Sequence, residues 1–198
     1  MASGSCAGAY SDRERKTLDV TRTLSSVSLL DGRRVDIRRA AASDRDAIRD
    51  FFSGLSPASL RWRFFGAPRR LNDRLIDQLV MIAPGRSAYL AVPAGRERSV
   101  VALAGYVHVP AEASCEISVA VADTWQGVRL GTLLLLAVLE DARTHGFRHF
   151  HAEVLADNVR MLGLLRELTV AFRTRVEAGV VRIEFELPAE TEQDLRRS

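Results

Sequence analysis

Apolar and polar residues alternate along several short stretches of the chain, and this two-residue period is typical of β-strands. These stretches cover residues 33–40, 87–94, 99–109, 115–122, 147–156, 170–178 and 180–187. In the first of them Val35 and Ile37 fall on one face, which we expect to be buried. Turn-forming residues at 110–114 and at Gly179 each join two neighbouring stretches, so we predict two hairpins there.

Apolar residues spaced three and four apart predict helices between these strands. The first predicted helix begins at Ser43, which is followed by acidic residues, and ends near Gly54. The second is SPASLRWRFF, where Ser56 has the character of an N-cap and Pro57 occupies the first helical position. The remaining predicted helices cover residues 71–80, 128–144 and 161–168, the last of them capped by Asp157 or Asn158.

The order of these elements predicts a mixed α/β architecture, because strands outnumber helices in the centre of the chain. A length of 198 residues fits one domain with tails better than it fits two domains. Residues 1–28 lack a sustained period, so we predict a flexible N-terminal arm there. The domain is then expected to span residues 29–187, followed by a C-terminal tail at 188–198.

Arginine supplies nearly all of the positive charge, since Lys16 is the only lysine and the net charge is +3. Arginine binds carboxylates and phosphates in a fixed geometry, although a bias in coding composition explains its abundance equally well. The densest clusters, within residues 33–39 and 61–70, lack the motifs of nucleic-acid recognition. We interpret them as solvated or docking surfaces and expect no nucleic-acid partner.

The two cysteines, Cys6 and Cys115, are far apart and match neither a disulfide framework nor a zinc-binding spacing. The N-terminus lacks the pattern of a secretory signal, and the apolar run at 133–139 is too short to span a bilayer. We therefore expect a cytoplasmic protein with no membrane partner.

The segment DTWQGVRLGT, residues 123–132, joins a predicted strand to the leucine-rich predicted helix. A glycine-containing turn of this kind exposes backbone N–H groups at the positive end of the helix dipole, where phosphate binds readily. Glycine also lets a ligand approach the backbone, because no Cβ intervenes. An empty strand-to-helix turn explains the same residues, since neither of the two common glycine-rich phosphate motifs is present.

The segment WQGVRLGTLLL resembles the acyl-CoA pyrophosphate loop of the GNAT N-acetyltransferase superfamily, whose motif is Q/R-x-x-G-x-G/A. Gln126, Leu130 and Gly131 match the motif, whereas Arg129 stands where the family usually has its first glycine. The arginine side chain either crowds the phosphate or donates a charge-assisted hydrogen bond to it.

The resemblance covers nearly all of residues 29–187 and is closest to the GNAT domain of bacterial protein lysine acetyltransferases. The segments that carry it are SPASLRWRFF, EISVAVADTWQG, AEVLADNVRML and GVVRIEFEL, while ELTVAF replaces the usual Leu-Gly-Phe after the last helix. It implies the GNAT acyl-CoA N-acyltransferase fold, a central, mostly antiparallel, twisted sheet flanked by helices. It also implies acetyl-CoA as co-substrate, no metal, a protein acceptor with a reactive lysine, and a monomer or homodimer.

The residues that the resemblance assigns to acetyl-CoA lie on one strand, in the turn and in the last helix. They are Val119, Ala120, Val121, Gln126, Gly127, Val128, Arg129, Leu130, Gly131, Thr132, Asn158 and Met161. Backbone groups of Val119 and Val121 would hold the pantetheine arm, as they do in the enzymes that this chain resembles. Asn158 is equally well explained as a helix N-cap.

Glu116 shares a strand face with Ser118 and Ala120, so its carboxylate is either exposed at an edge or buried for use. In the lysine acetyltransferases that the chain resembles, the matching glutamate is the general base. A base is needed because a lysine amine, with a pKa near ~10.4, is mostly protonated at neutral pH. The alternatives are an N-acetyltransferase for a small amine and a non-catalytic acyl-CoA-binding module, the latter because no tyrosine follows Tyr106 to act as general acid.

Overall fold

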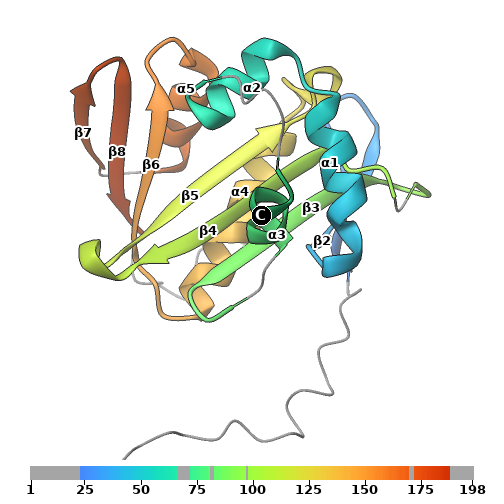
Figure 1. The fold of residues 1–198 in the computed structure, drawn as a ribbon, viewed down its shortest axis with the longest axis horizontal. Coiled ribbons are helices and arrows are strands. Elements are labelled where there is room, and N and C mark those ends of the chain that lie inside the picture. The colour runs from blue at the N-terminus through green and yellow to red at the C-terminus, as the bar shows by residue number, and fades with distance from the viewer. Residues whose placement is uncertain (1–22, 67–71, 81–82, 97, 170–171, 188–198) are drawn as a thin grey trace, which may run out of the picture.

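The computed structural model describes residues 23–66, 72–80, 83–96, 98–169 and 172–187. Their strands form a single eight-stranded sheet in the order β1-β2-β3-β4-β5-β6-β8-β7 (Figure 1). The strands are β1 (Thr23–Ser28), β2 (Arg34–Arg39), β3 (Arg86–Pro93), β4 (Ala102–Val109), β5 (Ser114–Val121), β6 (His149–Leu155), β7 (Phe172–Glu177) and β8 (Val180–Glu186). All neighbouring pairs are antiparallel except β5 and β6, which confirms the predicted mixed, mostly antiparallel sheet.

Helices cover both faces of this sheet. They are α1 (Arg45–Ser53), α2 (Pro57–Phe64), α3 (Asp73–Val80), α4 (Leu130–Thr144) and α5 (Val159–Leu168), with short 3-10 turns η2 (Ala42–Asp44), η3 (Pro110–Glu112) and η4 (Asp123–Trp125). One apolar core packs α1 and α3 against one face of β3 and β4, and a larger core packs α4 and α5 against the other face. Val35 and Ile37 are buried in the larger core, as their alternation predicts. Within the described ranges, no helix is long and apolar enough to cross a membrane.

Strand β1 changes the expected start of the domain. The sequence pattern predicts a flexible arm that includes residues 23–28, but these residues pair with β2 in antiparallel register, with Val27 opposite Val35. Val27 also packs against the larger core. Backbone hydrogen bonds to β2 and this apolar contact hold β1 in place, although its serines give no alternating pattern in the sequence. The start expected at residue 29 is therefore too late, and residues 1–22 and 188–198 lie outside the described residues.

The first helix also begins differently from the expectation. The turn η2 precedes α1, and Asp44, rather than Ser43, makes the polar contacts at this end. The Asp44 carboxylate accepts the Ala41 N–H at 2.8 Å and binds two guanidinium nitrogens of Arg38, each at 2.7 Å. This bidentate pair anchors the start of the helix to β2.

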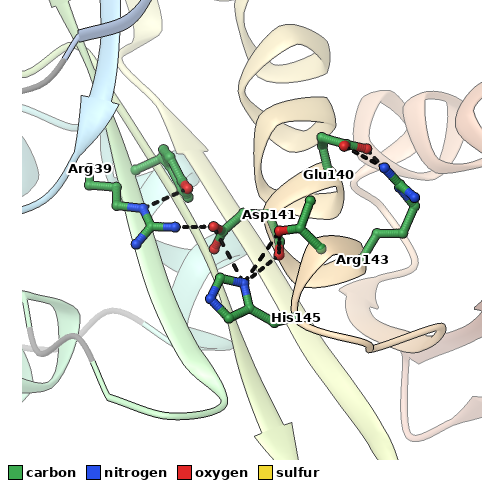
Figure 2. A network of polar contacts seen from close by, with 7 residues as sticks. Arg39, Glu140, Asp141, Arg143 and His145 are labelled. Carbon is green, nitrogen blue, oxygen red and sulfur yellow. Dashed lines mark hydrogen bonds and ion pairs between the residues drawn. The ribbon is translucent and has the colours of Figure 1, made fainter. Parts of the chain in front are cut away.

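A buried carboxylate on α4 connects this helix to the sheet (Figure 2). The Asp141 side chain is 6% exposed and pairs with the Arg39 guanidinium, whose Nε donates to the Tyr89 hydroxyl at 2.9 Å. His145 Nδ1 donates to the Asp141 carbonyl oxygen at 2.7 Å and so closes the same helix turn. Burial raises the pKa of Tyr89 to about 12, so its hydroxyl stays neutral and keeps its proton. These contacts fix where α4, and hence its N-terminus, lies on the sheet.

We expect Arg39→Leu to lower the free energy of unfolding by about 3 kcal/mol, because it leaves the buried Asp141 carboxylate without its guanidinium partner. The double variant Arg39→Leu/Asp141→Leu should recover most of this loss, since no buried charge remains. Urea denaturation measures both. Arg45→Leu removes the exposed pair with Asp77 and should cost less than about 1 kcal/mol. Equal losses in the single and double variants would contradict the role given to Asp141.

Candidate active site

The sheet opens between β5 and β6. These two parallel strands pair only at Cys115 with Phe150 and at Glu116 with His151, and beyond this point they diverge (Figure 1). A pocket of about 480 Å³ occupies the gap, lined by residues 116–121 of β5 and 152–154 of β6. The β6-facing backbone edge of β5 lacks a strand partner in the described chain along this stretch. An extended ligand could therefore pair with it as a strand would.

The N-terminus of α4 forms one end of the pocket. Arg129 is the N-cap residue of this helix, and its side chain makes no capping hydrogen bond. Gly127 and Arg129 both adopt left-handed backbone conformations, with φ of 78° and 67°. The position at which Arg129 replaces the expected glycine is thus one that favours glycine, and the arginine is strained there. Free N–H groups at a helix N-terminus, together with an exposed arginine, make this end attractive to phosphate.

The turn before α4 is tied to α2 by a shared carboxylate. Asp123 accepts hydrogen bonds from the Ser56 N–H at 2.9 Å, the Ser56 hydroxyl at 2.7 Å and the Ser59 hydroxyl at 2.8 Å. The Gln126 amide donates to the Val121 carbonyl at 3.1 Å and to the Ser59 hydroxyl at 3.2 Å. Partial burial alone would raise the pKa of Asp123, but the hydrogen bonds from Ser56 and Ser59 outweigh burial and lower it.

Glu116 lies at the other end of the pocket. Its side chain is exposed and shares a sheet face with Ser118, whose hydroxyl accepts a hydrogen bond from Arg63 Nη2 at 3.2 Å. Burial lowers the pKa of Arg63, and the charge of Glu116 opposes this shift. The sequence allowed an exposed or a buried carboxylate at Glu116, and the carboxylate is exposed. It faces the pocket, because β5 lies inside the sheet and not at its outer edge.

The pocket brings together nearly all of the residues that the sequence singled out. Those that line it are Glu116, Val119, Ala120, Val121, Gln126, Gly127, Arg129, Leu130, Gly131, Thr132, Asn158 and Met161. Val128 does not line the pocket and packs against the larger core instead. Asn158 also caps α5, since its side-chain oxygen accepts the Met161 N–H at 3.2 Å.

Several lining residues were not predicted. Trp62 and Arg63 of α2, together with Phe65 directly after it, line the pocket. The motif SPASLRWRFF was the available signal, but the 3.6-residue period does not say whether an aromatic side chain faces a core or a cavity. Glu153 and Arg160 line the pocket from β6 and α5.

Two features outside the pocket bear on its chemistry. Cys115 is fully buried and forms no disulfide among the described residues, and burial raises its pKa to about 11. Tyr89 and Tyr106 are buried in the larger core, so neither described tyrosine lines the pocket. Among the residues that the structure describes, no group of histidine, cysteine, aspartate and glutamate could hold a metal ion.

We expect Arg129→Gly to raise the free energy of unfolding by about 1 kcal/mol, because glycine adopts φ near 67° without strain. Arg129→Ala is the matched control, since it removes the guanidinium but keeps the Cβ. Urea denaturation of both variants measures the difference. If the two variants unfold at the same urea concentration, the backbone strain assigned to Arg129 is absent.

We expect Asp123→Asn to destabilise the protein by about 1 kcal/mol at pH 7 through weaker hydrogen bonds to Ser56 and Ser59. Because the folded-state pKa of Asp123 is lowered, its charge adds stability above the unfolded pKa, near ~3.9, and this stability is lost as pH falls through the folded pKa. The gap between wild type and variant should therefore shrink towards pH 3. A gap that stays constant in unfolding experiments from pH 7 to pH 3 would refute this.

Comparisons with known proteins agree with this geometry. The model of the Acetyltransferase (GNAT) family matches residues 52–169. Acetyltransferase PA5475 of Pseudomonas aeruginosa is 36% identical over 139 residues, which are 69% of this chain and 75% of that protein. Acetyltransferase Pat of Mycolicibacterium smegmatis is 27% identical over 128 residues, which are 64% of this chain and 38% of Pat.

The fold is similar to that of a solved acetyltransferase domain. The crystal structure of the GNAT domain of S. lividans PAT superposes with a TM-score of 0.75 at 26% identity, covering 82% of this chain and 96% of that domain. The family match spans the pocket from α2 through α5 and includes the turn before α4. The chain therefore belongs to the GNAT family of acetyltransferases.

Proposed function

We propose that this acetyltransferase moves the acetyl group of acetyl-CoA to a lysine side chain of a protein, with Glu116 as general base. The observation that carries the proposal is the layout of one pocket, with an anion-attracting helix end at one side, a carboxylate at the other and an unpaired strand edge between them. From Glu116 to Val121 an extended strand covers ~16 Å, at ~3.3 Å per residue. This span suits an extended pantetheine arm.

Acetyl-CoA fits the residues present. The first N–H groups of α4 would hold the pyrophosphate, and the charges of Arg129 and Arg160 would add to the attraction. Arg160 is held towards the turn, since its Nη1 donates to the Gln126 side-chain oxygen at 3.3 Å. Backbone groups of Val119 and Val121 would bind the pantetheine arm, and Asn158 and Met161 would border its far side.

The proposed chemistry is direct transfer. Glu116 removes a proton from the lysine ammonium, and the free amine attacks the thioester carbonyl, whose developing oxyanion a backbone N–H stabilises. CoA then leaves as a thiolate. A thiol pKa near ~8.5 makes the thiolate a good leaving group, so transfer does not depend on a tyrosine as general acid.

A protein acceptor is supported by two observations. The chain is similar to Acetyltransferase Pat and to the GNAT domain of a PAT protein, although it covers only 38% of the former. Glu116 is also exposed and lies opposite His151 of β6, on the sheet face where an open groove runs along β6, β8 and β7 and leaves room for a large acceptor. We further propose the cytoplasm as the compartment, where a free thiol such as Cys115 stays reduced.

We expect Glu116→Gln to lower kcat by about 10²- to 10⁴-fold, because glutamine cannot accept the proton. Its dissociation constant for acetyl-CoA should match that of the wild type, as measured by calorimetric titration. Glu167→Gln is the matched control, since Glu167 also lines the pocket. Unchanged turnover by Glu116→Gln would remove Glu116 from the role of base.

The acceptor class is tested with labelled acetyl-CoA. Protein extracts and a panel of small amines are offered separately, and the label is followed into protein lysines by mass spectrometry. Label on protein lysines supports the proposal. Transfer to small amines alone would show a small-molecule enzyme, and binding of acetyl-CoA without CoA release from any acceptor would show a non-catalytic module.

A further inference from the structure

A row of ionisable side chains crosses the sheet and begins at Glu116. In register, Glu116 lies opposite His151 on β6, His151 opposite Glu184 on β8, and Glu184 opposite Arg173 on β7. Register partners on neighbouring strands point to the same face, with Cβ atoms about 5 Å apart. His151 is therefore the side chain next to the proposed base.

His151 is buried, being only 3% exposed, while the rest of the row is exposed. Its Nδ1 lies 2.9 Å from the Ser114 hydroxyl and 3.7 Å from a Glu112 carboxylate oxygen. Its Nε2 has no hydrogen-bond partner among the described residues, which leaves one ring nitrogen available for proton transfer. This arrangement orients the ring through one nitrogen while the other remains free.

The charged groups around His151 keep it neutral near pH 7. Burial lowers the pKa of His151, and the charge of Arg182 lowers it further, whereas Glu112, Glu116 and Glu153 oppose the shift. Arg182 itself is neutralised by acids, since it pairs with Glu112, with Glu153 at 3.5 Å and with Glu184 at 2.9 Å. A neutral imidazole can accept a proton, so His151 is in the state that a relay requires.

A second, open groove of about 1210 Å³ lies on this face of β6, β8 and β7. Glu112, Ser114 and Glu153, which surround His151, line this groove, and Glu153 also lines the proposed acetyl-CoA pocket. His151 itself lines neither cavity. It is buried between Glu116, which lines the first, and Glu112, Ser114 and Glu153, which line the second.

We propose that His151 carries protons from the Glu116 carboxyl group to the groove lined by Glu112 and Glu153, an inference that rests on the proposed role of Glu116 as base. Each lysine ammonium gives one proton to Glu116, which passes it to His151, and the resulting imidazolium releases it to water in the groove. The same nitrogen loses a second proton when the amide forms, and Glu116, ionised again, accepts it. Of the two protons that the nitrogen loses, one ends on the CoA thiolate and the other is released to solvent.

The direction of the relay follows from the two functional groups. A carboxylic acid gives up its proton more readily than an imidazolium does, which favours transfer from Glu116 to His151 and restores the carboxylate. His151 acts through Glu116 and does not touch the substrate. We therefore describe it as a positioning and relay residue and not as a catalytic one.

The first test measures the contact between the two residues without any acceptor. NMR titration of the histidine ring nitrogens gives the pKa of His151 in the wild type and in Glu116→Gln. Loss of the neighbouring carboxylate should lower the His151 pKa further, because the imidazolium loses a favourable charge. Glu167→Gln should leave it unchanged. An identical His151 pKa in wild type and Glu116→Gln would overturn the relay.

The second test measures turnover by the enzyme, with acetyl-CoA as donor and Nα-acetyl-lysine amide as the acceptor probe. His151→Asn keeps a partner for Ser114 but cannot carry a proton, so we expect kcat to fall about 10- to 100-fold at low buffer concentration. The KM for acetyl-CoA should not change. Added imidazole should restore the rate of the variant and leave the wild type unaffected.

His149→Asn is the matched control, because His149 lies on the same strand and face but is 62% exposed, opposite Glu186. A normal rate in His151→Asn, or a loss that imidazole does not restore, would overturn the relay. Should His151→Asn fail to fold by circular dichroism, the NMR titration decides alone. Normal turnover by Glu116→Gln would overturn the proposed base and the relay together, whereas an inactive Glu116→Gln with a normal His151→Asn would overturn the relay alone.

Discussion

The divergence of two parallel strands is the constraint on which the rest of this molecule depends. β5 and β6 pair at only two positions, and then β5 continues with its backbone groups facing a cavity. Buried backbone N–H and C=O groups need partners, so this edge favours a ligand that is itself extended and polar. A long, narrow acyl carrier satisfies that requirement better than a compact molecule does.

The core on the far side of the sheet determines where the cavity ends. The Arg39–Asp141 pair holds α4 against β2, and the first turn of α4 then faces the gap between the strands. Strain at Arg129 is stored at that same end, where a left-handed residue begins the helix. The packing of α4 and the chemistry of the pocket are therefore linked. A change in the position of α4 on the sheet would move its N-terminus, which is the end that attracts anions.

Periodicity was sufficient to predict most strands and helices, because each buries one face against an apolar core. It was not sufficient for β1, whose serines carry little apolar signal and whose order comes from pairing with β2. The face of Glu116 followed from alternation, and the turn at the start of α4 followed from its glycines. The proximity of Glu116 and His151 could not be predicted, since it depends on the parallel register of two strands separated by α4 in the sequence.

Asp123 has a consequence for how the two substrates influence each other. One carboxylate holds both the start of α2, which lines one side of the pocket, and the turn that precedes α4. A molecule that immobilises the turn also immobilises the helix, and thermodynamic linkage makes the effect mutual. Binding of acetyl-CoA should then order the surface that binds the acceptor. The two substrates would bind in a fixed order, and the ternary complex would form cooperatively.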